Sequence, residues 1–190
     1  MSNQNGSVLV ALALVSSLVL AEPANAVKRR AFATSVTGTG NLNSWPDADG
    51  LFGLAAADRI CRNRAAAGGL SNANAYRAWL STAATDAYCH VQGRAGKRAT
   101  GCSGTPQPAG PWFILSGTSN FTGSLDELTG PERKIVRGVL QDEFGDFYGN
   151  TDNHRYWTGT SPTGEVTPAT CSSWVVAAAD VQGAIGEALA

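Results

Sequence analysis

A chain of 190 residues, with 14 Lys and Arg against 15 Asp and Glu, is long enough for one domain and almost electrically neutral. This balance argues against recognition of nucleic acid, or of a strongly acidic partner, through overall charge. Its four cysteines are typical of a protein that folds in an oxidising compartment.

The first residues predict export. Residues 8–21 form an apolar run of about 14 positions, which suits a signal-peptide core and is too short to span a bilayer. Ala24-Asn25-Ala26 then gives the small-x-small pattern of a cleavage site, although no Lys or Arg precedes the run. We expect a signal peptide over 1–26, with an uncleaved anchor or a buried helix as the alternative. The mature domain, 27–190, is then secreted or periplasmic and has no membrane span.

The mature chain predicts an α+β order rather than regular βαβ units. Small and apolar residues at three- and four-residue spacing predict one long helix over 51–67, which Gly68-Gly69 ends. A second helix is predicted over 132–140, after Pro131, and a helical turn over 125–128. A solvated tail is expected over 28–30. Strands are predicted over 31–37, 76–81, 112–115, 155–159 and 172–176.

Six segments, taken in order, carry a resemblance to a known family. They are AFATSVTGTGNL, GLAAADRICRNRAAAGGL, YRAWLS, GPWFIL, QDEFGD and RYWTGTSPTGEVTPATCSSW. Together, over approximately residues 31–176, they resemble the endostatin-like branch of the C-type-lectin fold, and most closely its bacterial secreted domains. The resemblance implies a single α+β domain in which two helices flank mixed, twisted strands. It also implies secretion and an adhesive or ligand-binding role.

The chain departs from that family near its end. In relatives, the cysteines that match Cys61 and Cys171 pair with partners close to the C-terminus, and both partners are absent here. The resemblance therefore implies that these two cysteines are unpaired, or are paired with each other. It also implies that the usual closing C-terminal strand is missing and that residues 44–50 are an insertion.

Several residues are candidates for binding. Cys89 and Cys102 flank a basic, Gly-rich loop, and we expect them to form a disulfide, with other pairings or free thiols left open. Guanidinium groups suit sulphate and phosphate, so clustered basic residues could bind a polyanion, although such clusters are often only solvated surface. The candidate ligand-binding residues are Arg59 and Arg62 on one helix face, Arg94, Lys97 and Arg98 in the loop, and Trp45 as an exposed aromatic contact.

The sequence predicts no metal site, no cofactor and no catalytic site. The acidic residues Asp142, Glu143, Asp146 and Asp152 lack the spacing of a calcium loop and predict a solvated loop. His90 is expected to be structural or exposed. No nucleophile motif of a known hydrolase class is present.

We therefore expect a secreted, non-catalytic module that binds an extracellular macromolecule: a matrix protein, a polyanionic glycan or a surface polysaccharide. One alternative is a secreted hydrolase that uses His154 or His90 with a nearby carboxylate. Another is a truncated family remnant without activity. The sequence specifies neither the ligand nor the oligomeric state. Four tryptophans are expected in the core: Trp79, Trp112, Trp157 and Trp174.

Overall fold

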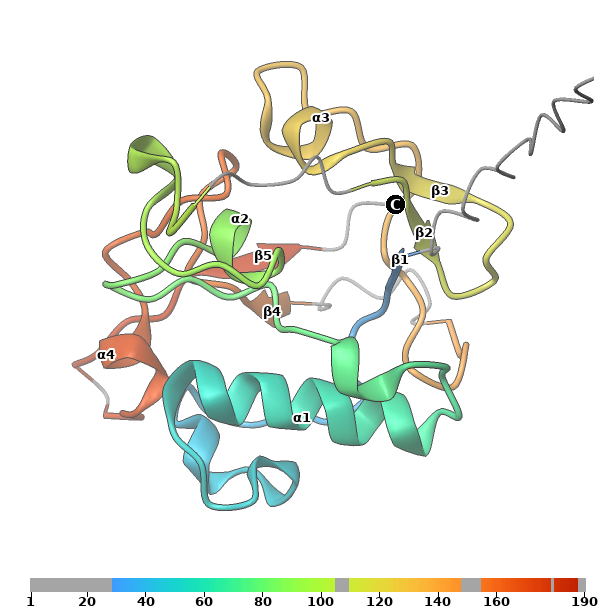
Figure 1. The fold of residues 1–190 in the computed structure, drawn as a ribbon. Coiled ribbons are helices and arrows are strands. Elements are labelled where there is room, and N and C mark those ends of the chain that lie inside the picture. Colours follow the sequence, from blue (N-terminus) through green and yellow to red (C-terminus); the bar gives the residue numbers. More distant parts are fainter. Residues whose placement is uncertain (1–28, 105–109, 148–154, 179, 188–190) are drawn as a thin grey trace, which may run out of the picture.

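The chain is α+β, as predicted, in a computed structural model that describes residues 29–104, 110–147, 155–178 and 180–187 (Figure 1). The predicted signal peptide, Asp152 and His154 lie outside these ranges. None of the helices within the described ranges combines the length and the hydropathy that a membrane span requires. The helices are α1 (Gly53–Ala67), α2 (Ala87–His90), α3 (Leu125–Thr129) and α4 (Cys171–Trp174).

One small sheet joins the start of the described chain to its middle. β1 (Arg29–Ala31) runs parallel to β2 (Trp112–Ile114), and β3 (Asn120–Thr122) runs antiparallel to β2. The prediction for 112–115 is confirmed. The first strand, however, lies at 29–31 rather than over 31–37, so Arg29 and Arg30 belong to a sheet and not to a solvated tail. Beyond the strand, the chain turns towards the loop that follows residue 140, where the Ala33 amide donates to the Gln141 carbonyl at 2.9 Å.

A second sheet contains a C-terminal strand, which corrects the expectation that the closing strand is missing. β4 (Arg155–Trp157) pairs antiparallel with β5 (Ile185–Glu187), with Tyr156 opposite Gly186. The Ala- and Gly-rich tail shows little intrinsic preference for a strand. Its pairing follows from the partner that the tertiary structure places beside it, because strand preference is mostly a property of context.

The long helix is confirmed, and it begins two residues later than predicted. α1 lies along one side of the molecule (Figure 1) and buries Ala56, Ala57 and Ile60. Small side chains there let neighbouring segments approach closely. The helix ends at the predicted place, where Gly69 adopts a left-handed backbone with φ of 67°.

The predicted helix over 132–140 is wrong, while the turn predicted over 125–128 is confirmed as α3. Ser124 caps α3, since its side chain accepts a hydrogen bond from the Glu127 amide at 3.1 Å. Residues after Pro131 instead lie against β3: the Val136 amide donates to the Phe121 carbonyl at 2.9 Å. Hydrogen bonding to a neighbouring strand therefore replaces the helix that the apolar spacing predicted.

Two further predicted strands are wrong. Residues 76–81 are irregular, although Ala78 and Leu80 are buried and the Ser81 amide donates to the Thr158 carbonyl at 3.0 Å. Residues 172–176 overlap α4 instead of a strand. Four single-turn 3-10 segments complete the described secondary structure: Leu42–Ser44, Pro46–Ala48, Ala73–Ala75 and Arg98–Thr100.

The main core lies between α1, α4 and the segment before Ser81. Trp174 is fully buried within it, and Trp157 packs against it with the two ring centroids 6.2 Å apart. Trp79 and Trp112 pack half-buried against a second, smaller cluster around Tyr88, Cys89 and Leu125. Each of the four tryptophans expected in the core therefore packs in one of the two clusters, but among these four only Trp174 is completely buried.

Candidate binding site

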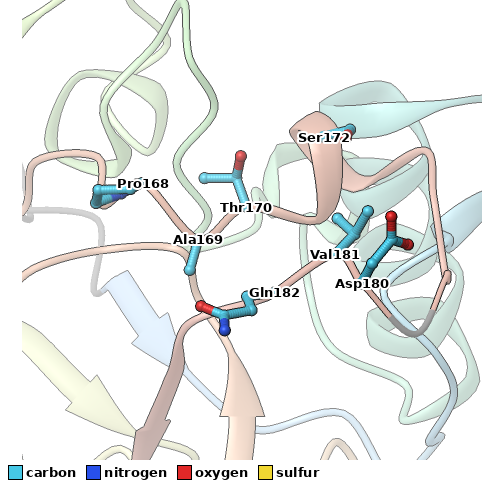
Figure 2. A pocket seen from close by; sticks show the side chains of 7 residues that line it. All are labelled: Pro168, Ala169, Thr170, Ser172, Asp180, Val181 and Gln182. Carbon is cyan, nitrogen blue, oxygen red and sulfur yellow. The ribbon is translucent and has the colours of Figure 1, made fainter.

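A pocket of about 350 Å³ opens beside α4 (Figure 2). One wall is the segment that leads into α4, and the other is the segment that leads towards β5. The lining residues are Pro168, Ala169, Thr170, Ser172, Asp180, Val181 and Gln182. Backbone hydrogen bonds join the two walls: the Cys171 amide donates to the Gln182 carbonyl at 2.9 Å, and the Ala184 amide donates to the Ala169 carbonyl at 2.7 Å. The walls are therefore held in a fixed relation to each other.

The rim of this pocket is a left-handed turn. All four residues of α4 have positive φ: 46° at Cys171, 52° at Ser172, 62° at Ser173 and 70° at Trp174. A left-handed backbone costs L-residues roughly 1–2 kcal/mol each, and none of the four is the glycine that would relieve this strain. Such strain persists only where the surrounding structure enforces it, and it is concentrated at functional sites.

Burial of Trp174 enforces the left-handed turn. Its indole is fully buried, and Nε1 donates to the Ser81 carbonyl at 2.7 Å. An indole buries roughly 200 Å², which at about 25 cal/mol per Å² stabilises this arrangement by about 5 kcal/mol. The turn also carries its own hydrogen bonds, from the Trp174 amide to the Thr170 carbonyl at 2.8 Å and from the Ser173 amide to Thr170 Oγ1 at 3.3 Å.

Two glycines allow neighbouring chain segments to pack closely against Cys171 in this turn. A Cβ at Gly40 would overlap Cys171 Sγ, and a Cβ at Gly183 would stand 2.7 Å from the same sulfur. Both positions therefore need glycine for the close approach of neighbouring chain segments, and not for their own backbone angles. Packing from two distant parts of the sequence thus fixes the pocket rim.

Four of the seven lining residues have polar side chains, and one of these four, Asp180, is charged. Ser172, Asp180 and Gln182 are exposed, and no hydrogen bond or ion pair joins their side chains to any residue that the structure describes. Hydroxyl, carboxylate and amide groups without internal partners are available to a ligand. Chemically, the pocket can donate and accept hydrogen bonds, and it carries one negative charge.

The predicted disulfide between Cys89 and Cys102 is confirmed; the two Cα atoms are 5.6 Å apart. Cys61 and Cys171 are both free, which settles the alternative of a bond between them. Burial raises the pKa of the Cys61 thiol to about 12, so this thiol stays protonated at neutral pH.

The two helix arginines are engaged with carboxylates and do not form an open basic face. Arg59 pairs with Asp49 at 3.5 Å, and Arg62 pairs with Asp58 at 3.3 Å. Asp49 belongs to residues 44–50, the segment that the family resemblance implied to be an insertion. That segment packs on α1 and neutralises part of its charge, so it is integral to the fold.

Lys97 and Arg98 also interact with other residues of the protein. Lys97 pairs with the buried Asp86 at 3.2 Å. The Arg98 guanidinium stacks over the Tyr88 ring at 4.3 Å and donates to the Thr163 carbonyl. Arg94 is exposed and has no ion pair within the described ranges, so only this member of the loop group retains a free charge.

Trp45 is not the exposed contact that its loop position suggested. Its ring packs half-buried against the main core, and Nε1 donates to the Thr39 carbonyl at 2.9 Å. Trp157 Nε1 donates to the neighbouring Gly38 carbonyl at 3.1 Å. The two indoles therefore hydrogen-bond to adjacent carbonyls of one short segment, which is a structural role.

His90 lies in a buried charge cluster away from the pocket. Its Nε2 is 2.8 Å from Asp58 Oδ1, and both side chains are about one-tenth exposed. Asp58 also accepts from the Ala78 amide and pairs with Arg62 and Arg77. Burial alone would raise the pKa of Asp58, but His90, the Ala78 amide and Arg77 outweigh it, and the net pKa is below the usual value. Among the described residues no hydroxyl bonds to His90, so the nucleophile that the hydrolase alternative requires is not beside it.

Of the acidic residues expected in a solvated loop, Asp142 and Glu143 are buried, which corrects the prediction for these two, whereas Asp146 is exposed as predicted and Asp152 lies outside the described residues. Glu143 is 1% exposed and accepts from Arg64 Nε at 2.7 Å and from the Ser35 amide at 2.9 Å. Burial alone would raise its pKa, but the hydrogen bonds from Ser35 and Arg64 outweigh it and lower the pKa. Within the described ranges no cluster of His, Cys, Asp and Glu could hold a metal ion.

Sequence reasoning missed every polar residue that lines the pocket. Asp180 and Gln182 lie in a weakly patterned tail, and Ser172 begins the segment 172–176, which was predicted to be a strand. The run of positive φ has no sequence signal, because it contains neither glycine nor asparagine. No protein-family model and no curated protein matches this chain.

Proposed function

We propose that this protein is a secreted or periplasmic, non-catalytic binding module of endostatin-like, C-type-lectin-like fold, and that it recognises an extracellular macromolecule through the α4 pocket. The observation that carries the proposal is the strained left-handed turn at Cys171–Trp174, which places the Ser172 hydroxyl beside Asp180 and Gln182 at the pocket; among the described residues these three side chains have no hydrogen-bond or ion-pair partner. Strain of this kind, held by a buried tryptophan, fixes a binding surface before the ligand arrives.

The charges of the molecule argue for some ligands over others. Of the candidate basic residues, Arg59, Arg62, Lys97 and Arg98 are engaged with carboxylates. A polyanionic glycan would have to compete with these internal partners. A matrix protein or an uncharged surface polysaccharide needs no such rearrangement, and both suit the pocket better.

The alternatives are less well supported. The remnant hypothesis depended on a missing closing strand, and β5 pairs with β4 where that strand was thought absent. A hydrolase that uses His90 would need the buried His90–Asp58 pair to open towards solvent and to acquire a nucleophile, while His154 lies outside the described residues. The carboxylate of Asp58 is already engaged by four partners.

The test is a binding screen of the full chain against immobilised matrix proteins, heparin and polysaccharides, repeated with Gln182→Trp. Gln182 is exposed and lines the pocket, so an indole there fills the space without disturbing the core. Thr118→Trp, at an exposed turn between β2 and β3, is the matched control. We expect Gln182→Trp to weaken binding at least tenfold and Thr118→Trp to leave it unchanged.

Two results would overturn the proposal: no binding to any class of macromolecule, or binding that Gln182→Trp leaves intact. Arg94→Glu adds a separate comparison, because Arg94 is the one loop cation without an ion pair in the described ranges. Binding that depends on Arg94 and not on Gln182 would move the site to the disulfide loop. Unfolding midpoints of all variants show whether each one is folded.

A further inference from the structure

We propose that the exposed segment 131–137 presents a cleavage site for proteases that cut after arginine, at the bond between Arg137 and Gly138, and that the cut protein stays assembled. This inference is independent of the α4 pocket and adds a site of covalent modification. It follows from the exposure of the segment, its charges, its backbone hydrogen bonds and the core contacts that cross the cut.

The segment is the most continuously exposed part of the described chain. It reads Pro-Glu-Arg-Lys-Ile-Val-Arg, and all seven residues are exposed, which is the longest such run in the described ranges. It follows α3 at the outer edge of the molecule (Figure 1) and belongs to no helix or strand. Even Ile135 and Val136 are 39% and 72% exposed. Proteases preferentially cut folded proteins at exposed loops of this kind.

The basic residues of the segment select the class of protease. A trypsin-like protease takes the side chain before the cut into a pocket whose carboxylate pairs with a guanidinium or ammonium group. Arg137 is exposed, and no hydrogen bond or ion pair joins its side chain to another residue that the structure describes. Its guanidinium is therefore available to such a pocket. Hydrolysis adds one water across the peptide bond, which leaves a carboxylate on Arg137 and an amino group on Gly138.

The backbone disfavours a cut after the other two basic residues, Arg133 and Lys134. A protease binds its substrate as an extended strand, so the chain around the cut must leave its own partners. Both backbone groups of Lys134 are bonded: the amide donates to the Glu127 carbonyl at 2.9 Å, and the carbonyl accepts from Thr122 Oγ1 at 2.9 Å. Arg133 has a φ of 44°, a left-handed backbone that differs from an extended strand.

The backbone from Arg137 onwards carries no such bonds. From 137 to 140 no backbone amide or carbonyl is hydrogen-bonded to a residue within the described ranges. The anchors on either side are the Val136 amide, which donates to the Phe121 carbonyl at 2.9 Å, and the Gln141 carbonyl, which accepts from the Ala33 amide at 2.9 Å. The four residues between these anchors can therefore open without breaking a backbone hydrogen bond, and local opening of this kind admits a protease.

Arg94 is the competing loop arginine outside the segment, and its backbone is held in place. It is exposed, but its amide donates to the Cys89 carbonyl at 3.0 Å within the disulfide loop. The carbonyl on the other side of the bond, that of Ala95, accepts from the Ser103 amide at 2.8 Å. Residues 105–109 and 148–154, outside the described ranges, contain no Lys or Arg and offer no competing bond.

Contacts across the core join the two pieces that the cut creates. Glu143, from the second piece, accepts from Arg64 Nε of the first piece at 2.7 Å. Trp174, also from the second piece, is fully buried, and its Nε1 donates to the Ser81 carbonyl at 2.7 Å. The disulfide lies wholly within the first piece, so non-covalent contacts alone must hold the second. Because these contacts are buried, we expect the cut protein to remain one folded body.

The experiment digests the full chain under native conditions with a small amount of trypsin. Stopped samples are reduced and weighed by mass spectrometry, which identifies the first internal cut and distinguishes it from shortening of the N-terminus at residues 28–30. The variants are Arg137→Gln and Arg137→Lys, and Arg94→Gln, at the other exposed loop arginine, is the matched control. Unfolding midpoints show whether each variant is folded.

We expect the first internal cut between Arg137 and Gly138. Arg137→Gln should slow the loss of intact chain about tenfold or more, because the protease carboxylate loses its charged partner. Arg137→Lys should still be cut at the same bond, and Arg94→Gln should be cut as fast as the wild type. Urea below the unfolding transition should change the rate little, since local opening exposes little surface. On size exclusion without denaturant, the two pieces should elute together at the volume of the intact chain.

The site assignment is overturned if the wild type resists trypsin until it unfolds, if the first internal cut falls at another residue, or if Arg137→Gln is cut as fast as the wild type. Pieces that separate without denaturant would overturn the claim that the cut protein stays assembled. None of these results bears on the α4 pocket, which the binding screen tests separately.

Discussion

Against α1 two carboxylates are buried and paired, whereas beside α4 three polar side chains are exposed and have no partner within the described ranges. Asp58 and Glu143 are each met by cations and amide donors in the protein interior. Ser172 and Gln182 have no such partners within the described ranges, and the backbone that carries Ser172 is strained. The difference teaches that buried charged residues such as Asp58 and Glu143 stabilise the fold, while exposed polar residues such as Ser172 and Gln182 remain available to a ligand.

The largest expected effect comes from breaking the buried pair near the end of α1. Glu143→Ala leaves the Arg64 guanidinium, which is 18% exposed, without its main partner. Removing one member of a buried ion pair costs about 3–5 kcal/mol, and we expect a loss in this range. Denaturant unfolding measures it. Asp146→Ala, at a nearby exposed carboxylate, is the control, and equal stabilities of the two variants would show that Glu143 is not a structural residue.

Opening the disulfide should have the next largest effect. Cys89 and Cys102 are 13 residues apart in sequence, and closure of a loop of this size stabilises a fold by about 3 kcal/mol. The double variant Cys89→Ala and Cys102→Ala should therefore unfold at lower denaturant. Reductant should destabilise the wild type and leave the double variant unaffected. A wild type that is indifferent to reductant would contradict this prediction.

The buried carboxylates also predict a pH dependence with a definite sign. The folded-state pKa of Glu143 lies below its unfolded value of about 4.3, so its stabilisation is fully present above that value. It is lost as pH falls through the lower, folded pKa. The stability difference between wild type and Glu143→Gln should be constant from neutral pH to about pH 5 and should shrink at more acidic pH. If the stability difference between wild type and Glu143→Gln grew on acidification, the pKa of Glu143 would be raised, not lowered, in the folded state.

Relief of backbone strain at the pocket rim should raise the free energy of unfolding, by less than the two losses described above. Ser172→Gly removes a left-handed L-residue, and we expect a gain in stability of up to about 1 kcal/mol. Ala66→Gly, at an exposed position of α1, should instead lose up to about 1 kcal/mol. Thermal unfolding separates the two variants. A loss at Ser172 as large as at Ala66 would mean that the left-handed turn stores no strain.

Removal of a surface ion pair should have the smallest effect. Arg59 and Asp49 are both about half exposed and 3.5 Å apart, and such pairs contribute about 0–1 kcal/mol. Arg59→Ala should change the unfolding free energy by less than about 0.5 kcal/mol. A loss comparable with that of Glu143→Ala would show that exposed and buried charges are equivalent in this protein, and the comparison between the two regions would collapse.

By itself the sequence determined the elements whose information is local. The small residues between Gly53 and Ala67 repeat at helical spacing and end at glycines, so α1 follows from the chain alone. The same is true of β2, and the position of Cys89 and Cys102 on either side of a basic, Gly-rich loop favoured a disulfide between them. In each case neighbouring residues carry the whole signal.

Only the tertiary structure decided the rest, because the deciding partners are distant in sequence. Glu143 is a buried structural anion because α1 brings Arg64 to it, 79 residues away. The tail forms β5 because β4 lies beside it, and α4 winds left-handed because Trp174 is enclosed under Ser81, 93 residues away. A strained backbone and a pocket formed by two chain segments depend on long-range packing, which leaves no local pattern to read.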